Sequence, residues 1–599
     1  MTVKILLLLL TIITASFAQT FTVATTSEFR QALENATVNG ESDTIIVKKG
    51  TYKTTDDNLG TFKFSDNEPY SLMIKSEDDT KNQNVIFSGD NMHQVFNLTN
   101  IDNNSNFSIS NLLIIDGNSS DYGGGIYTDK NLTIKNVTIA NNFSNNDGGG
   151  IFGKTMNIYD SNISKNSSRY YGGIYTIDGY KTVIKNSILN SNKNGAIYNG
   201  YQLTVYNSKL LNNTSNAIVG KNINVELSEI TGNVGTGIRG YRIIVNKSNI
   251  SSNQGGAISS SAYNETVIVK DSNISNNTGN SAIFCNKSDS TLIVVDSILT
   301  ENIYKKAGGA IYSAGNLYII NSIFTDNIAN IGGAIYGSTL TVLNSIFNNN
   351  SASDSADTIF GAGIFINNIF SKNKNDIYFG DDSKLFNNFI DYTKLENESS
   401  YTIIKKNNIQ SSSNEIGFTD TDFRLSENSP VINKGLDPYG TTFKELLGAE
   451  YETVIGYLKT DKDGNERVSS SAIDMGAYEN GSAKVCAQVI TYAIDSLTNT
   501  CKEFATPCDV PNNWKTVVSC PVQEPSSSNP SQTLNCNENA ISKITISGQW
   551  FLLGADGDNC SVSALKEQGA KYVYPFNANK NNYYIEGNIE RGYGFWIMK

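Results

Sequence analysis

Histidine chemistry has little place in this sequence, because His93 is the only histidine among 599 residues. A histidine-based metal site needs a second imidazole, and a Ser-His-Asp triad would have to use His93 itself. That residue lies in the stretch GDNMHQVF, which predicts a surface turn or strand edge. The search for chemistry therefore moves to carboxylates, aromatic rings and cysteines.

Carboxylates recur at one position of a repeating pattern. Asp160, Asp271 and Asp296 are equivalent, and carboxylates stacked about 5 Å apart could bind a cation or act as a general acid and base. The same position elsewhere holds Asn186, Asn207, Leu227 and Lys247. This tolerance favours a structural corner over a catalytic one. Asp121 and Asp147 also nearly coincide, just before glycines, where a turn role is favoured.

A candidate calcium loop lies at DKDGN. Asp461, Asp463 and Asn465 resemble the start of a Ca²⁺ loop, in which alternate oxygens face one ion. The distal Glu of an EF-hand is missing, since position 472 is Ala472. A plain turn is the default interpretation. We expect no cofactor, with calcium at this loop as the alternative.

Aromatic residues follow a repeated Ile and form a candidate ladder. If the Ile side chains point inward, the rings point outward and could hold a glycan by contact with ring faces; if the rings point inward, they are core. The sequence favours packing and leaves glycan contact as the alternative. The residues are Tyr127, Phe152, Tyr175, Tyr198, Phe284, Tyr312 and Tyr336.

Six of the seven cysteines gather near the C-terminus. In an exported chain this clustering predicts local disulfides. Zinc is a poorer fit, because the spacings lack paired C-x₂₋₄-C knuckles. The disulfide candidates are Cys486, Cys501, Cys508, Cys520, Cys536 and Cys560.

An internal repeat of 20 to 26 residues must position all these groups. LTIKNVTIANN at Leu132 returns as LTVYNSKLLNN at Leu203 and IIVNKSNISSN at Ile243, each with the two-residue apolar alternation of a strand. One such unit cannot bury its apolar face, whereas stacked units share a continuous core. We therefore predict an all-β, right-handed parallel β-helix solenoid. The Asn that closes each unit is interpreted as a corner residue of left-handed conformation, its amide bonding along the stack.

The chain divides at changes of composition. Lys4, the apolar run from Ile5 to Ile13 and small residues before Ala18 predict a cleaved signal peptide. Thr25 and Glu28 form a capping box, which predicts an N-terminal capping helix over about 27–36. The expected domains are the signal peptide (1–18), N-terminal cap and first coils (19–105), β-helix repeats (106–395), last coils and ending (396–480), a Cys-containing segment with a Pro/Ser linker (481–535), and a small C-terminal β module (536–599).

Two kinds of partner are excluded by composition. The net charge is −12 and no basic run stands out, so nucleic acid is not an expected partner. No stretch after the signal peptide is long and apolar enough for a transmembrane helix.

Tryptophans Trp550 and Trp596 are expected in the core of the C-terminal module, with an exposed sugar platform as the alternative.

Three motifs carry a resemblance to known families. The verbatim GGAI ending at Ile258, Ile311 and Ile335, with F-x-x-N at Phe324 and Phe347, resembles the repeats of polymorphic outer-membrane-type β-helix passengers. DFRLSENSPVINKG (422–435) and DKDGNERVSSSAIDMGAYE (461–479) resemble a choice-of-anchor Q ending. Together the resemblance covers about residues 20–480. It implies a secreted or surface-exposed β-helix of the cell envelope, with roles in adhesion or polysaccharide contact.

Three functions remain as hypotheses. The leading one is a non-enzymatic, adhesin-like surface protein that binds an extracellular polysaccharide or another cell-surface component. The rival is a lyase or hydrolase acting on an extracellular acidic polysaccharide. The third is a passive spacer that presents the C-terminal module.

Overall fold

The computed structural model describes the solenoid and its ending almost continuously. The described residues are 18–66, 69–78, 84–100, 105–356, 358–373, 378–391, 404–412, 416–419, 421–467, 472–480, 491–495, 501–504, 510, 514–517, 533–534, 550–555, 560–561, 572–577, 582–583, 588–589 and 594–598. The predicted signal peptide and Pro/Ser linker lie outside them. The chain forms two compact units, Met1–Cys486 and Ala487–Lys599.

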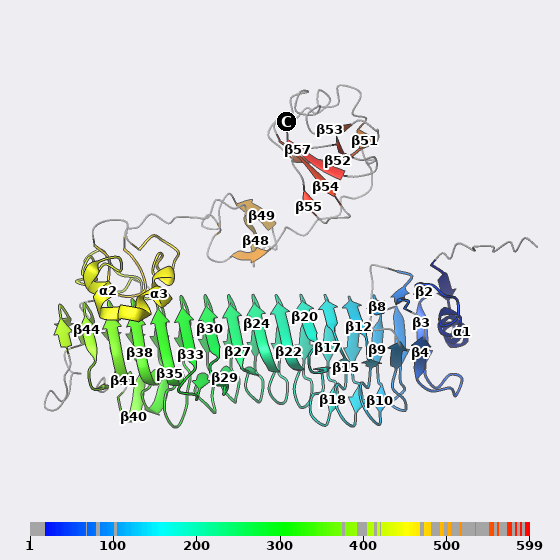
Figure 1. Cartoon of the computed structure of the whole chain (residues 1–599), viewed down its shortest axis with the longest axis horizontal. Helices are drawn as coiled ribbons and strands as arrows, with labels where there is room; N and C mark the ends of the chain where they lie inside the picture. Colours follow the sequence, from blue (N-terminus) through cyan, green and yellow to red (C-terminus); the bar gives the residue numbers. More distant parts are fainter. Residues whose placement is uncertain are drawn as a thin grey trace, which may run out of the picture. The chain divides into compact units, whose positions relative to one another are not determined.

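The first unit is a right-handed parallel β-helix of about 15 turns, which confirms the predicted fold class (Figure 1). Three rows of short parallel strands run along it, and rows 1 and 2 together make one 26-stranded sheet.

Row 1 contains β4 (Phe62–Asp66), β7 (Phe96–Asn100), β11 (Ile126–Thr128), β15 (Ile151–Gly153), β19 (Ile174–Thr176), β26 (Ile238–Gly240), β29 (Ile258–Ser260), β32 (Ile283–Cys285) and β43 (Tyr378–Phe379). Five longer strands pass through both row 1 and row 2: β22 (Ile197–Tyr206), β24 (Ile218–Glu226), β35 (Ile311–Ile320), β38 (Ile335–Leu343) and β41 (Ile359–Ile366).

Row 2 contains β1 (Thr20–Val23), β2 (Asp43–Val47), β5 (Leu72–Ser76), β8 (Asn106–Ser110), β12 (Asn131–Lys135), β16 (Met156–Tyr159), β20 (Lys181–Lys185), β27 (Arg242–Asn246), β30 (Thr266–Lys270), β33 (Thr291–Val295), β44 (Lys384–Phe386) and β46 (Ile404–Lys406). Short strands in the loops that leave row 3 are β10 (Asn118–Ser119), β14 (Phe143–Ser144), β18 (Ser167–Ser168), β37 (Ile328–Ile331) and β40 (Ser351–Ser355).

Row 3 contains β3 (Gly50–Lys53), β6 (Val85–Ser88), β9 (Leu113–Ile115), β13 (Thr138–Ala140), β17 (Asn162–Ser164), β21 (Ile188–Asn190), β23 (Lys209–Leu211), β25 (Glu229–Thr231), β28 (Asn249–Ser251), β31 (Asn273–Ser275), β34 (Ile298–Thr300), β36 (Ile323–Thr325), β39 (Ile346–Asn348), β42 (Ile369–Ser371), β45 (Phe389–Asp391) and β47 (Ile409–Ser411).

Alternation along each short strand fills the interior. In β22, Leu203 and Val205 are fully buried while Gln202 and Thr204 face outward, and the same holds for Ile243 in the coil after next. Registered pairing places like residue on like residue, as between Leu203 and Ile223. Because each coil buries its apolar edge against the next, one continuous core runs along the solenoid.

The repeated Asn forms a buried ladder rather than the left-handed corner itself. Nδ2 of Asn253 donates to Oδ1 of Asn277 at 3.0 Å and to the carbonyl of Ile230 at 3.0 Å. The left-handed conformation belongs to the preceding residue, for example Ser252 at φ 56°. The sequence therefore predicted the bonding along the stack correctly. It placed the left-handed backbone conformation on the Asn, whereas the structure has it on the residue before.

The Asp-bearing corner is the second left-handed position of each coil. Asp160, Asp271 and Asp296 have φ values of 51°, 48° and 50°, and Leu227 at the same place has 50°. The residue after this corner is usually Ser, and its hydroxyl accepts from the backbone of the previous coil, as Ser272 Oγ does from Ser248 N at 3.1 Å. A tolerant corner is thus confirmed.

Helix α1 (Thr26–Ala36) covers the first coil. Thr25 accepts from Glu28 N at 3.2 Å, as the predicted capping box requires, whereas the Glu28 carboxylate accepts from the backbone N of Ala24 at 2.7 Å, one residue before the N-cap. Phe29 is fully buried against Phe62 and Phe87. The helix thereby closes the open apolar end of the core.

The coils end at β46 and β47, and the following segment lies on the flank instead of continuing them (Figure 1). This segment contains α2 (Thr441–Leu447), η2 (Gly448–Glu450), α3 (Tyr451–Val454) and η3 (Ile455–Tyr457). Phe443 and Val454 pack on the outer face of row 2 near Val295 and Ile320. The stretch 396–480, expected to hold last coils and an ending, is therefore mostly a lateral cover.

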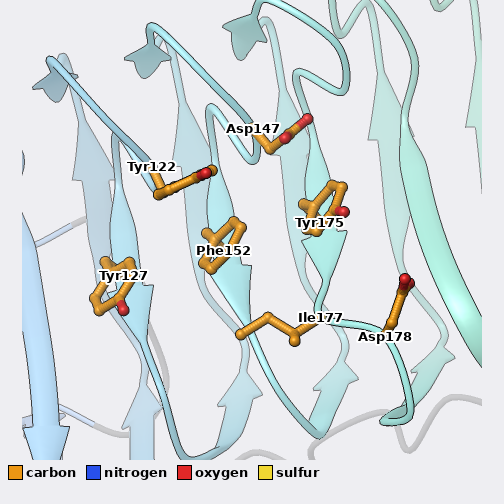
Figure 2. A pocket seen from close by; sticks show the side chains of 7 residues that line it. All are labelled: Tyr122, Tyr127, Asp147, Phe152, Tyr175, Ile177 and Asp178. Carbon is orange, nitrogen blue, oxygen red and sulfur yellow. The ribbon is translucent and has the colours of Figure 1, made fainter.

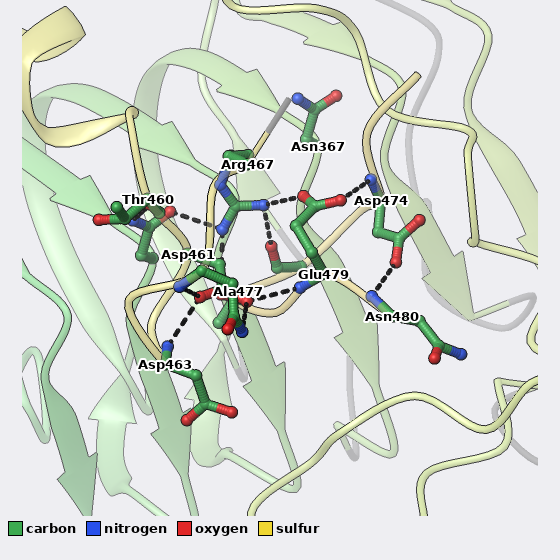
Figure 3. A network of polar contacts seen from close by, with 12 residues as sticks. Asn367, Thr460, Asp461, Asp463, Arg467, Asp474, Ala477, Glu479 and Asn480 are labelled. Atoms are coloured by element: carbon green, nitrogen blue, oxygen red, sulfur yellow. Dashed lines mark hydrogen bonds and ion pairs between the residues drawn. The ribbon is translucent and has the colours of Figure 1, made fainter. Parts of the chain in front are cut away.

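A buried ion pair anchors this cover (Figure 3). The guanidinium of Arg467 pairs with Glu479 at 2.7 Å and donates to Oδ1 of Asn321, at the corner after row 2, at 2.8 Å. The side chains of Arg467 and Glu479 are 0% and 8% exposed. The cover is thus tied to a coil almost 150 residues earlier in the chain.

The described strands of the second unit pair antiparallel, apart from one short parallel pair, β51 with β52. They are β48 (Thr491–Asp495), β49 (Cys501–Phe504), β50 (Trp514–Val517), β51 (Thr533–Leu534), β52 (Trp550–Ala555), β53 (Cys560–Ser561), β54 (Tyr572–Asn577), β55 (Asn582–Tyr583), β56 (Asn588–Ile589) and β57 (Gly594–Met598). Throughout the described parts of both units, no helix has the length and hydropathy to cross a bilayer.

Candidate functional site

The predicted aromatic ladder lies on the outer face of row 1. Each ring follows a fully buried Ile, such as Ile126 before Tyr127 or Ile174 before Tyr175. Successive residues of a strand point to opposite faces, so the rings stand outside the core. Phe152 is 8% exposed, and the other predicted ring residues are half-buried.

The first four rings form a stacked run. Tyr127 and Phe152 have centroids 5.6 Å apart with planes at 6°, Phe152 and Tyr175 are 5.2 Å apart at 3°, and Tyr175 and Tyr198 are 4.6 Å apart at 12°. Their burial is therefore largely mutual. The rings therefore lie outside the core and pack on one another, with their faces covered by stacking and their edges turned outward.

A hollow of about 390 Å³ opens over this run (Figure 2). The rings of Tyr127, Phe152 and Tyr175 form one wall, and Tyr122 adds a tilted ring 4.4 Å from Phe152. Asp147 lies on one side of the ring row and Asp178 on the other, beside Ile177. We call this hollow, lined by these seven residues, the aromatic groove.

Asp147 is held in the loop between β14 and β15. Its own carbonyl accepts from Ser144 Oγ at 3.0 Å, which fixes the turn, but its carboxylate oxygen Oδ1 is buried and has no hydrogen-bond partner among the described residues. Burial raises the pKa of this carboxyl to about 6. The predicted turn role is therefore only part of its description.

Asp178 follows β19 and has a defined position. Tyr198 donates its hydroxyl to Oδ1 of Asp178 at 3.3 Å. An added Cβ at Gly200 would lie 1.8 Å from the same oxygen, so only glycine at position 200 leaves room for it. Burial, and after it the charges of Asp178 and its neighbours, raises the pKa of Tyr198, so the hydroxyl stays a proton donor.

A second stacked run continues along row 1 after an interruption at Val219, Arg239 and Ser259. It comprises the predicted Phe284, Tyr312 and Tyr336 and then Phe360 and Tyr378, with centroid separations of 4.8 to 5.3 Å. Sequence reasoning missed the last two, although both follow an Ile, because the glycines of the repeat are lost there.

A second depression of about 600 Å³ lies in the same coils but on row 2. It is lined by Tyr201, Gln202, Asn222, Arg242 and neighbouring residues of row 2. The coils are shortest in this stretch, with ladder asparagines only 20 residues apart between Asn213 and Asn253.

In the candidate calcium loop the carboxylates of Asp461 and Asp463 are engaged by the protein, whereas Oδ1 of Asn465 is buried without a hydrogen-bond partner among the described residues. The two carboxylate oxygens of Asp461 accept from the backbone N of Asp463, Asn465 and Glu479 and from Nδ2 of Asn465. Asp463 pairs with Arg424 at 2.9 Å. Among the described residues no group of three or more acidic, His or Cys side chains is placed to hold a metal, and calcium at this loop stays a prediction.

The stacked corner carboxylates do not open onto a groove. Asp296 is 9% exposed, accepts from Asn321 Nδ2 at 3.1 Å and lies beneath the cover, whose Lys462 donates to the Asp296 carbonyl at 2.7 Å. Burial raises the pKa of Asp296 to about 6. The contacts around Asp296 hold the corner and the cover together.

Most cysteine predictions fall outside the described residues. Of the six candidates only Cys501 and Cys560 are described, in β49 and β53, and the pairing stays a prediction. The side chains of Trp550 and Trp596 are also outside the description. Cys285, which the sequence left alone in the repeats, is a buried free thiol.

No protein-family model matches the sequence, and no curated protein matches it either. Solved structures do match. An alginate lyase from Paenibacillus is 15% identical over 50% of this chain and 97% of its own, with a TM-score of 0.26. The A-module of a mannuronan C-5 epimerase from Azotobacter vinelandii is 13% identical over 53% and 91%, with a TM-score of 0.26. The catalytic unit of an α-1,3-glucanase from Streptomyces thermodiastaticus is 12% identical over 65% and 66%, with a TM-score of 0.28. At these identities the likeness concerns the fold alone.

Proposed function

We propose that this chain is a secreted or cell-surface, adhesin-like glycan-binding protein whose contact surface is the aromatic groove. The observation that carries the proposal is the run of stacked, outward-facing rings with a hollow above it. The stacked rings offer the hollow a continuous apolar strip of ring edges. Binding there costs little further conformational freedom, because each ring is already held by its neighbours. The carboxylates at the sides of the hollow supply hydrogen-bond acceptors for hydroxyl groups.

The export signal and the family resemblance belong to the same proposal. A cleaved leader and polymorphic-type repeats with an anchor-like ending would bring the groove to the cell exterior, where polysaccharides and other cell surfaces are the available partners. Cell fractionation with an antibody to the solenoid tests this part. Recovery of the full-length chain in the cytoplasm alone would contradict it.

Binding itself is tested with a glycan array, followed by calorimetry on the intact chain. The double variant Phe152→Ala/Tyr175→Ala should lose about 1 kcal/mol per ring, or roughly fivefold in affinity for each. Tyr201→Ala is the matched control, because this exposed Tyr lines the other hollow. Unchanged affinity in the double variant, or no glycan bound by the intact chain, would refute the proposal.

Hydrolysis of the bound glycan is a second candidate, favoured by Asp147, whose pKa burial raises to about 6, and by a second carboxylate, Asp178, on the other side of the ring row. A carboxyl with a raised pKa and a second carboxylate are the usual acid and base of glycoside hydrolysis. Release of new reducing ends that stops in Asp147→Asn and in Asp178→Asn would establish this activity. Binding without product would leave the non-enzymatic proposal in place.

A further inference from the structure

The charges around the aromatic groove are of one sign. Its lining contains two carboxylates, Asp147 and Asp178, and no Lys or Arg. Neither carboxylate forms an ion pair with any described residue, and Asp121 adds a third acid nearby, bonded to Asn146 Nδ2 at 2.6 Å. The basic side chains of this region lie over other rings, Lys154 over Tyr180 and Arg169 over Tyr170.

This charge distribution disfavours an acidic ligand. A uronate would bring like charge against two carboxylates, one of them partly buried, and like-charge contacts are strongly unfavourable. A neutral sugar could bond the carboxylates but would leave their charge uncompensated after water is displaced.

The rings supply shape rather than charge. Tyr127, Phe152 and Tyr175 stack face against face, so the groove meets mainly their edges. A cation is attracted to the face of an aromatic ring and not to its edge, so these rings form no cation–π site between them. The attraction for an ammonium group comes from the two carboxylates, and the ring edges offer apolar contact to the sugar.

The protein leaves the charge of Asp147 uncompensated. Its Oδ1 is buried and has no hydrogen-bond partner among the described residues. A partly buried, unpaired carboxylate is stabilised by a positive charge placed nearby. Hydrogen bonds between an ammonium group and a carboxylate are also stronger than those between neutral groups.

We infer that the ligand of the aromatic groove is a glycan carrying protonated amino groups, such as a deacetylated amino-sugar polymer. The inference rests on the proposed glycan-binding function and specifies its ligand class. The sugar rings would lie along the stacked run, with their ammonium groups directed to Asp147 and Asp178.

The test compares three oligosaccharides of equal length by calorimetry with the full chain: a glucosamine oligomer, its fully N-acetylated form and an oligouronate. The buffer is kept just below about pH 7, where much of the amine is protonated and Asp147, with its pKa raised to about 6, is still mostly ionised. We expect the glucosamine oligomer to bind about tenfold more tightly than the acetylated one, a difference of about 1.4 kcal/mol, and the oligouronate to bind weakest.

Substitutions separate this inference from the broader function. Asp147→Asn and Asp178→Asn should each weaken binding of the glucosamine oligomer more than binding of the acetylated one, so that most of the preference for the amine is lost. Asp160→Asn is the control, since this acid lies at the corner after row 2 and already has the left-handed φ that Asn accepts.

Equal binding of the two sugar forms, or a preference for the uronate, would overturn the amino-sugar assignment while glycan binding stood. A preference that survives Asp147→Asn together with Asp178→Asn would overturn it as well. Failure of all three oligomers to bind, with no glycan found on the array, would overturn the proposed function itself.

Discussion

Asp147 shows how a single residue of a regular repeat acquires individual chemistry. The sequence placed it beside Asp121 as a turn residue, and the Ser144 hydroxyl does fix that turn. Asp147 faces the groove because of the path that the loop takes after row 3. The residue pattern of the repeat does not predict the path of a loop. Asp178 escaped prediction altogether, because it lies in a turn that interrupts the repeat.

The raised pKa of Asp147 predicts a pH-dependent effect on stability. In the unfolded chain an Asp carboxyl titrates near 3.9, so the folded chain binds the extra proton between there and about 6. Stability contributed by this group is present below that window and is lost as the pH rises through it. Asp147→Asn should therefore raise the melting temperature relative to the wild type more at pH about 8 than at pH about 4.

Melting curves at both pH values check this prediction. The same measurement on Asp160→Asn, at an exposed corner, gives the comparison for a substitution away from the groove. A pH-independent difference for Asp147→Asn would contradict a desolvated carboxyl at this place.

The buried Asn ladder predicts a large local loss of stability on substitution. Asn253→Ala would leave the Ile230 carbonyl and the Asn233 amide groups without their partners. Each buried group left unsatisfied should destabilise the coil by about 1–3 kcal/mol. Asn286 is exposed in the loop that follows β32 of row 1. Asn286→Ala should change the unfolding free energy by less than about 0.5 kcal/mol.

Urea unfolding with hydrogen exchange at the neighbouring coils measures the difference. Equal protection in the two variants would show that the ladder amides contribute no more than surface residues.

At the scale of elements, the repeat could be read from the sequence and the cover could not. The apolar alternation in LTVYN and the equivalent repeats predicts which side chains enter the core. Thr25 and Glu28 predict the start of α1. The cover depends instead on contacts such as Arg467 with Asn321, which are far apart in sequence. Outward-facing Ile293 and Ile320 do give a signal: an apolar residue on the solvent face of row 2 requires something to cover it.

The Arg467–Glu479 pair should be essential to the attachment of the cover. Arg467→Met leaves the Glu479 carboxylate buried without its partner, which should destabilise the segment by about 3–5 kcal/mol. We expect rapid proteolysis near α2 and α3 and faster hydrogen exchange there, while the coils of β22 to β30 keep their protection.

Arg424→Met provides the comparison within the same segment. Arg424 is 38% exposed in its pair with Asp463, so its loss should change stability by no more than about 1 kcal/mol. Similar proteolysis of the two variants would contradict the anchoring role of the buried pair.

At the scale of the whole molecule, the solenoid should function without the second unit. All residues of the aromatic groove lie in the first compact unit, and its core is continuous from α1 to the last coils. A fragment of residues 19–480 should therefore bind glycans with the affinity of the full chain. Calorimetry with the same oligosaccharides measures this, and loss of binding in a folded fragment would favour the spacer hypothesis, with the C-terminal module as the binding part.

The two stacked runs on row 1 have a consequence for long ligands. Four coil steps separate Tyr198 from Phe284, or roughly 19 Å at the usual spacing of strands. A short oligosaccharide reaches one run only, whereas a polymer lying along the axis can engage both. Its second contact is then intramolecular and benefits from a high effective concentration. Affinity should accordingly rise in a step, not smoothly, once the glycan is long enough to bridge the interruption.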